Sequence, residues 1–250
     1  MSESNNNLVM FFNDLQMNKR NITNSSSGND FEDNLRRTLR SQGFDYVKPD
    51  NDKVLREYLD KIKPKVLDVL SFEVLKNELA DKGAKYTNIF VHQPYGSQQF
   101  PDFIIFTEKN IICMESKYST KKGVKPVWNS NLPKSNTIYI FGSYGKRDVT
   151  FFLGEDILPQ NERVILNNFF SETTNKLMKD FQSELKSKFD SKEMLFEHGF
   201  NVYIRKAFEQ NRVINVEAEL DCFGKSRTLN EESVKVHIAK WEEDSNSEVA

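Results

Sequence analysis

The sequence predicts a mixed domain of the α/β or α+β class, in which one twisted central sheet is flanked by helices. Apolar residues recur at helical spacing in the first third of the chain, and short apolar runs typical of strands follow in the middle. A further helical pattern then precedes a second group of strand-like runs. With 250 residues, 38% of them hydrophobic and 29% charged, the chain is long enough to bury a sizeable core.

Helices are expected both before and after the central strands in the sequence. The first follows the polar stretch 18–30, has Asp30 as its N-cap and ends near Gly43. The second covers about 51–82, with a break near Pro64. A third, long and amphipathic, follows the strands. The apolar positions that indicate the first and third helices are Phe31, Leu35 and Leu39, and Leu177, Phe181, Leu185 and Phe189.

The predicted strands fall into two groups, and a hairpin turn at 107–110 lies within the first. The central group comprises 88–92, 103–106, 111–114, 137–141 and 149–153. The second group, which forms additional C-terminal strands, comprises 201–208, 213–223 and 233–241. We therefore divide the chain into a partly flexible N-terminal segment (1–27), a core (28–200), a β-rich part packed on the core (201–241) and a disordered tail (242–250).

Composition excludes several classes of protein. No apolar run approaches the roughly 20 residues that a membrane-spanning helix needs, and the N-terminus does not resemble a secretory signal. Two cysteines are too few for a disulfide framework, and no cysteine or histidine cluster has zinc-binding spacing. We therefore expect a cytoplasmic protein without a membrane partner. The net charge of −2 argues against indiscriminate coating of nucleic acid.

Positive charge is nevertheless concentrated in residues 115–147, which hold seven lysines and arginines and one acid, Glu115. This basic stretch begins at a group of residues suited to metal-dependent chemistry. Asp102 precedes the first strand of the predicted hairpin and Glu115 follows the second, so both carboxylates should meet at its open end. Because side chains alternate along a strand, Lys117 should share the face of Glu115, with Ser116 opposite.

Two convergent carboxylates repel each other unless a cation neutralises them. Oxygen ligands suit Mg²⁺, which keeps several waters and accepts one or two protein carboxylates together with a phosphate. Such a metal can acidify a water and stabilise charge on a phosphate under attack, while Lys117 holds the water or the phosphate. The sequence therefore predicts a Mg²⁺ site at Asp102 and Glu115.

The pattern of Pro101-Asp102, an intervening apolar strand and Glu115-Ser116-Lys117 resembles the PD-(D/E)XK nuclease superfamily, which includes many type II restriction endonucleases. Members often carry a further glutamate on an N-terminal helix in a Gly-X-X-Phe-Glu-like context. Residues 28–32 are similar to that context, which makes Glu32 a candidate fourth catalytic residue. Residues 125–133 and 138–142 extend the resemblance, which covers about 28–157.

The resemblance implies a restriction-endonuclease-like core, Mg²⁺ as cofactor and cleavage of double-stranded DNA at a specific short sequence. It also implies a cognate DNA methyltransferase in the same restriction-modification system, and leaves the enzyme as a monomer or a homodimer. Alternatives are a structure-specific or repair nuclease of the same fold, or a non-catalytic DNA-binding module. A surface hairpin with an ordinary Glu115–Lys117 salt bridge is the structural alternative.

DNA contacts are expected in two places. The loop after Lys117 offers lysines for phosphates and asparagines for base edges or phosphates, while its tryptophan either stacks in the groove or packs in the core. A predicted turn between two C-terminal strands offers a second basic cluster. The expected contacts are Lys121, Lys122, Lys125, Trp128, Asn129, Asn131 and Asn136 in the first place, and Lys225 and Arg227 in the second. The three histidines, His92, His198 and His237, share no motif and are expected to be structural.

Overall fold

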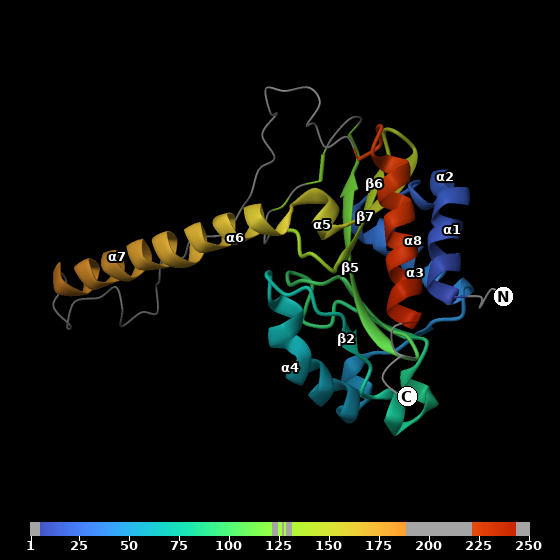
Figure 1. The fold of residues 1–250 in the computed structure, drawn as a ribbon, viewed down its shortest axis with the longest axis horizontal. Coiled ribbons are helices and arrows are strands. Elements are labelled where there is room, and N and C mark those ends of the chain that lie inside the picture. Colours follow the sequence, from blue (N-terminus) through green and yellow to red (C-terminus); the bar gives the residue numbers. More distant parts are fainter. Residues whose placement is uncertain (1–5, 122–124, 127, 129–131, 189–221, 244–250) are drawn as a thin grey trace.

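The computed structural model describes residues 6–121, 125–126, 128, 132–188 and 222–243. It confirms an α+β fold with a mixed sheet flanked by helices (Figure 1). The helices are α1 (Asn7–Met17), α2 (Lys19–Ile22), α3 (Gly28–Ser41), α4 (Lys53–Leu67), α5 (Gly154–Ile157), α6 (Gln160–Asn168), α7 (Asn175–Lys188) and α8 (Arg227–Glu243). Shorter helical turns are η1 (Pro49–Asn51), η2 (Ala80–Lys82), η3 (Ala84–Tyr86) and the π-helical η4 (Phe169–Thr174).

Within the described residues, seven strands form one open sheet in the order β1-β3-β4-β5-β6-β7, and β2 pairs with β5 beside this path. The β1–β3 and β5–β6 pairs are parallel and the others are antiparallel. The strands are β1 (Asp45–Tyr46), β2 (Leu75–Lys76), β3 (Ile89–His92), β4 (Phe103–Phe106), β5 (Asn110–Ser119), β6 (Ile138–Ser143) and β7 (Asp148–Leu153). All five central strands expected from the sequence are therefore confirmed, four of them with shifted ends.

Helices cover both faces of the sheet. In Figure 1, α1, α3 and α8 gather on one side of the strands and α4 lies on the other. Strand β4 shows how alternation builds both layers: Phe103 and Ile105 join the core under α1, α3 and α8, while Ile104 and Phe106 join the core under α4. Burial of both faces explains why β4 reads as a continuous apolar run.

The two N-terminal helices differ in detail from the expectation. Helix α3 begins at Gly28 with Ser27 as its N-cap, so Asp30 lies in the first turn, where its backbone N–H donates to the Ser27 hydroxyl. The predicted second helix ends at Leu67, and Pro64 lies inside its last turn. The apolar residues beyond that end do not extend the helix, because Leu75 pairs with Ile111 of β5 in strand β2.

The N-terminal segment is part of the main core. Helix α1 buries Leu8, Phe11, Phe12 and Leu15 completely, against the same cluster that contains the central strands. A boundary at residue 27 therefore does not separate a distinct unit. Four fully buried apolar side chains hold this helix on the sheet.

The C-terminal prediction is also wrong where the structure describes it. Residues 233–241 form part of α8 rather than a strand, and Glu242 and Glu243 belong to the helix rather than to a tail. Val234 and Ile238 are buried one helical turn apart, whereas Val236 between them is 47% exposed. The alternating apolar pattern fits both periods over so few residues, and packing on the sheet selects the helix. The predicted strand 201–208 and most of 213–223 lie outside the described residues, but Cys222 and Phe223 form a turn.

Helices α6 and α7 project from the body as a long rod (Figure 1). Arg163 of α6 anchors its base: the side chain is fully buried, and its guanidinium donates to the carbonyl of Pro133 at 2.8 Å and to Glu155 at 2.9 Å. Farther along the rod, Leu177 and Phe181 are 60% and 45% exposed. No helix among the described residues is long and apolar enough to cross a bilayer.

Candidate active site

The β4–β5 hairpin brings Asp102 and Glu115 together, as its register requires. Phe103 pairs with Met114, so Asp102, directly before β4, lies opposite Glu115. The expectation that Glu115 follows its strand is wrong, because β5 continues to Ser119 and pairs there in parallel with β6. Glu115 and Lys117 are therefore held on a rigid strand rather than on a loop.

Asp102 is oriented by the part of β5 that extends beyond β4. Its Oδ2 accepts hydrogen bonds from the Ser116 backbone N–H at 2.8 Å and from the Ser116 hydroxyl at 2.7 Å. In return, the backbone N–H of Asp102 donates to Glu115 Oε2 at 3.1 Å. These bonds tie the Asp102 carboxylate to Ser116 and the Glu115 carboxylate to the backbone of Asp102. Within the described residues, Asp102 Oδ1 accepts no hydrogen bond and remains available to a ligand.

Lys117 shares the face of Glu115, as strand alternation predicts. Its ammonium group lies 2.8 Å from Glu115 Oε1, and the two side chains are only 19% and 13% exposed. The same ammonium group lies 5.9 Å from the centre of the Trp128 ring. The pair is therefore partly buried at the end of the hairpin, unlike an ordinary surface salt bridge.

Glu32 reaches this region from α3, and its partners come from the end of β3. Glu32 Oε2 lies 2.7 Å from His92 Nε2 and accepts a bond of 3.2 Å from Gln93 Nε2. The backbone N–H of Gln93 also donates to the Asp102 carbonyl at 2.7 Å. His92 and Gln93 therefore link Glu32 to the Pro101-Asp102 segment. The sequence could have indicated His92 and Gln93 as site residues, because they lie at the end of the predicted strand that pairs with β4.

The electrostatics show an excess of negative charge. Burial, followed by the charges of Glu115 and Glu32, raises the pKa of Asp102 to about 7. The charge of Glu32 is therefore close enough to raise the pKa of Asp102, although α3 lies far from the hairpin in sequence. Among the described residues, three carboxylates thus share one lysine and one histidine, so a further cation would stabilise their ionised forms.

The residues present fit a magnesium ion better than a softer metal. Within the described part of the chain, no group of three or more histidine, cysteine or acidic residues is placed so that it could hold a metal ion. Mg²⁺ does not need three such ligands, because it keeps several waters and uses one or two carboxylates. Asp102 and Glu115 provide those carboxylates, and the high pKa of Asp102 indicates that its ionised form lacks a compensating charge.

The expected DNA-contacting loop is only partly described. Lys122, Asn129 and Asn131 lie outside the described residues, Lys121 is exposed and Lys125 is partly buried. Trp128 is 4% exposed and packs edge-to-face on Tyr139 at 5.1 Å, so of its two expected placements the core is the one observed. The side-chain amide of Asn136 donates to the Glu73 carbonyl.

The basic stretch is less available to DNA than its composition indicates. Lys134, one of its seven positive charges, is 1% exposed and donates to the Val66 carbonyl. Burial lowers its pKa to about 8. Lys117 is engaged by Glu115. Lys146 and Arg147 remain exposed at the β6–β7 turn.

The expected turn between C-terminal strands is wrong at Lys225 and Arg227, because these residues lead into α8. Lys225 is exposed, whereas the Arg227 guanidinium forms ion pairs of 2.7 Å with both Asp148 and Glu231. Arg227 therefore ties α8 to β7. The hairpin geometry that favoured a DNA contact at this place is absent.

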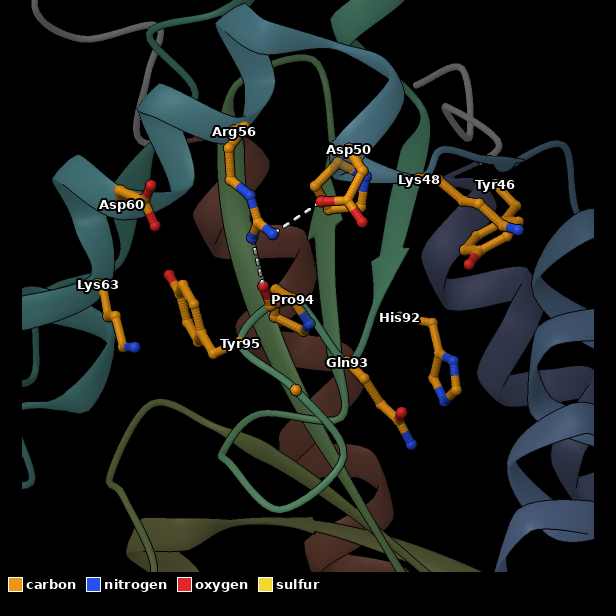
Figure 2. A pocket seen from close by; sticks show the side chains of 12 residues that line it. Tyr46, Lys48, Asp50, Arg56, Asp60, Lys63, His92, Gln93, Pro94 and Tyr95 are labelled. Atoms are coloured by element: carbon orange, nitrogen blue, oxygen red, sulfur yellow. Dashed lines mark hydrogen bonds and ion pairs between the residues drawn. The ribbon is translucent and has the colours of Figure 1, made fainter.

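A pocket of about 730 Å³ opens at the end of β3 (Figure 2). His92 and Gln93, the two partners of Glu32, line it together with residues of η1, α4 and the segment after β3. Sequence patterns do not reveal this pocket, because its walls come from separate elements. The lining residues are Tyr46, Lys48, Pro49, Asp50, Arg56, Asp60, Lys63, His92, Gln93, Pro94, Tyr95 and Gly96.

A scan against protein-family models, a search of curated proteins and a search of solved structures each find no match to this chain.

Proposed function

We propose that the protein is a Mg²⁺-dependent type II restriction endonuclease, which cleaves phosphodiester bonds of double-stranded DNA at a specific short sequence. The observation that carries this proposal is the meeting of Asp102, Glu115 and Lys117 at the open end of the β4–β5 hairpin. Support also comes from Glu32, which α3 brings near enough to raise the pKa of Asp102. The proposal includes a restriction-endonuclease-like core.

Each residue has a distinct role in this proposal. Asp102 and Glu115 ligate Mg²⁺, which supplies charge neutralisation at the phosphate and acidifies a water. Ser116 holds the Asp102 carboxylate through two hydrogen bonds, so that its free oxygen keeps one direction. Glu115 holds the Lys117 ammonium group at 2.8 Å, where it can donate to the attacking water or to the scissile phosphate.

Glu32 assists from helix α3. Its carboxylate is fixed by His92 and Gln93, so it orients a water or a phosphate-bound ion without a large rearrangement. The context implied for such an enzyme is cytoplasmic, with a DNA methyltransferase that protects host sites and no stable complex between the two. The enzyme acts as a monomer or as a homodimer.

The decisive experiment compares wild type with Asp102→Ala and Lys117→Ala in cleavage of plasmid DNA with Mg²⁺ or with EDTA. We expect wild type to release discrete fragments only with Mg²⁺, and both variants to lose about 10³-fold or more in rate, which corresponds to about 4 kcal/mol of transition-state stabilisation. Glu57→Ala is the matched control, since this residue of α4 is exposed and forms only a 3.7 Å pair with Lys53.

Three results would contradict the proposal in different ways. Cleavage by both variants at the wild-type rate would show that the site is wrongly assigned. Preference for branched or damaged DNA over intact plasmid would favour a structure-specific or repair nuclease. DNA binding without cleavage under any metal condition would favour a non-catalytic module.

A further inference from the structure

The pocket at the end of β3 has cations that protein carboxylates do not neutralise. It is lined by Lys48, Arg56 and Lys63 against Asp50 and Asp60. Arg56 is engaged, because it pairs with Asp50 at 2.8 Å and donates to the Pro94 carbonyl at 3.2 Å. Within the described part of the chain, neither Lys48 nor Lys63 forms an ion pair with a carboxylate. The pocket therefore presents two ammonium groups to a ligand.

The two lysines lie apart in the pocket. Figure 2 shows Lys63 at one side, on α4, and Lys48 at the other, with Pro94 and Gln93 between them. An anion with a single charged group contacts one of them, whereas a ligand with repeated negative charges contacts both. The volume of about 730 Å³ lies in the range of ligand pockets and admits a segment of one strand rather than a whole duplex.

The aromatic residues favour phosphates over bases as the occupants. The Lys63 ammonium group lies 4.8 Å from the centre of the Tyr95 ring, and the guanidinium of Arg36 lies 4.7 Å from that of Tyr46. One face of each ring is therefore occupied by a cation. A base that stacked on that face would displace the cation, whereas a phosphate can bind the cation where it lies.

The pocket adjoins the candidate active site through two residues, His92 and Gln93. His92 and Gln93 line it and also contact Glu32, whose charge acts on Asp102. A cationic pocket thus adjoins an acidic, metal-binding site. This arrangement suits a polyanion, because flanking phosphates bind the lysines whether or not a metal ion holds the scissile phosphate at the carboxylates.

We propose that this pocket binds the sugar-phosphate backbone of the DNA strand being cut, with Lys48 and Lys63 contacting phosphates that flank the scissile one. The inference rests on the proposed nuclease function and adds the path of the substrate. It directs the strand over β3 and α4, whereas the sequence placed the DNA contacts after Lys117 and near Lys225.

The test measures binding of a short blunt DNA duplex by fluorescence anisotropy in EDTA, where metal-dependent cleavage is prevented. Lys48→Gln/Lys63→Gln is compared with wild type over 50–200 mM salt. Each phosphate contact contributes about 0.9 to the magnitude of the slope when the logarithm of the DNA-binding constant is plotted against the logarithm of the salt concentration. Loss of two contacts should therefore reduce that magnitude by about 1.8. Lys53→Gln/Lys82→Gln is the control, because it makes the same charge change at exposed positions outside the pocket.

The proposal is supported if the pocket variant alone loses slope while its melting temperature matches that of wild type. It is overturned if both double variants retain the wild-type slope, if both lose it equally, or if wild type does not bind the duplex. Plasmid cleavage with Mg²⁺ is measured separately on wild type and Asp102→Ala. If wild type cleaves the plasmid but the pocket variant keeps the wild-type salt slope, the proposed DNA contact in the pocket is overturned and the nuclease function is not. If the pocket variant loses slope but wild type does not cleave, the nuclease function is overturned and the DNA contact is not.

Discussion

Two charged clusters in this protein have similar residues but differ in their balance of acids and cations. The first contains Asp102, Glu115 and Glu32 with Lys117 and His92. In the second, Arg227 of α8 pairs with Asp148 and Glu231 at 2.7 Å each, and Lys19 lies 3.3 Å from Asp148. The second cluster has two acids for two permanent cations, whereas the first has three acids for one.

The difference indicates what each cluster is for. In the Arg227 cluster, charges compensate one another and join α2, α8 and β7, so no external ion is required. In the Asp102 cluster, burial and neighbouring carboxylates raise the pKa of Asp102 to about 7. A group held in an unfavourable ionisation environment is typical of a functional site, because a ligand can provide the missing charge.

The largest expected effect is a pH dependence of folding stability that arises at Asp102. The folded-state pKa of about 7 exceeds the unfolded value near 3.8, so ionised Asp102 destabilises the fold. This cost is nearly absent below about pH 4, grows as pH rises and is complete above about pH 7. As the pH rises from 5 to 8, the free energy of unfolding of Asp102→Asn should therefore increase by about 2–3 kcal/mol relative to that of wild type. Urea unfolding in EDTA measures this difference.

Asp33→Asn is the matched control for this pH effect, since Asp33 is 55% exposed in its ion pair with Arg36. Its stability should follow that of wild type across the same range. Parallel curves for wild type and Asp102→Asn would contradict the raised pKa, and with it the claimed imbalance of charge.

A second prediction concerns the balanced cluster. Arg227→Met should lower the free energy of unfolding by about 2 kcal/mol, because it leaves the half-buried carboxylate of Asp148 and the buried one of Glu231 without their main partner. Chemical denaturation at pH 7 measures this loss. Lys225→Met, at an exposed position nearby, should change stability by less than about 0.5 kcal/mol. Equal effects for both variants would remove the structural role assigned to Arg227.

The smallest expected effect is stabilisation by Mg²⁺. At a concentration about tenfold above its dissociation constant, Mg²⁺ should raise the free energy of unfolding by about 1.4 kcal/mol in wild type. Asp102→Ala should lose this gain and Arg227→Met should keep it, as measured by thermal unfolding with Mg²⁺ or EDTA. Stabilisation of Asp102→Ala to the wild-type extent would place the ion elsewhere.

Local sequence determined much of the fold and of the candidate site. The central strands and the 107–110 turn follow from short apolar runs with turn residues between them. Because a hairpin aligns residues by register, the meeting of Asp102 with Glu115 and the shared face of Lys117 could be predicted from spacing alone. Helix α3 with Glu32 likewise follows from helical periodicity.

Tertiary structure decided the features that depend on residues far apart in the chain. Glu32 and His92 are separated by 60 positions, and their contact requires α3 to pack beside the end of β3. Packing also determined that residues 233–241 form a helix and that the side chains of Lys134 and Trp128 are buried. It likewise brought Arg227 into its ion pair with Asp148 of β7. Sequence determines which periodicities and register partners are available, because these depend on neighbouring residues. The burial and charge environment of a side chain depend on every element that packs around it, and only the assembled fold specifies them.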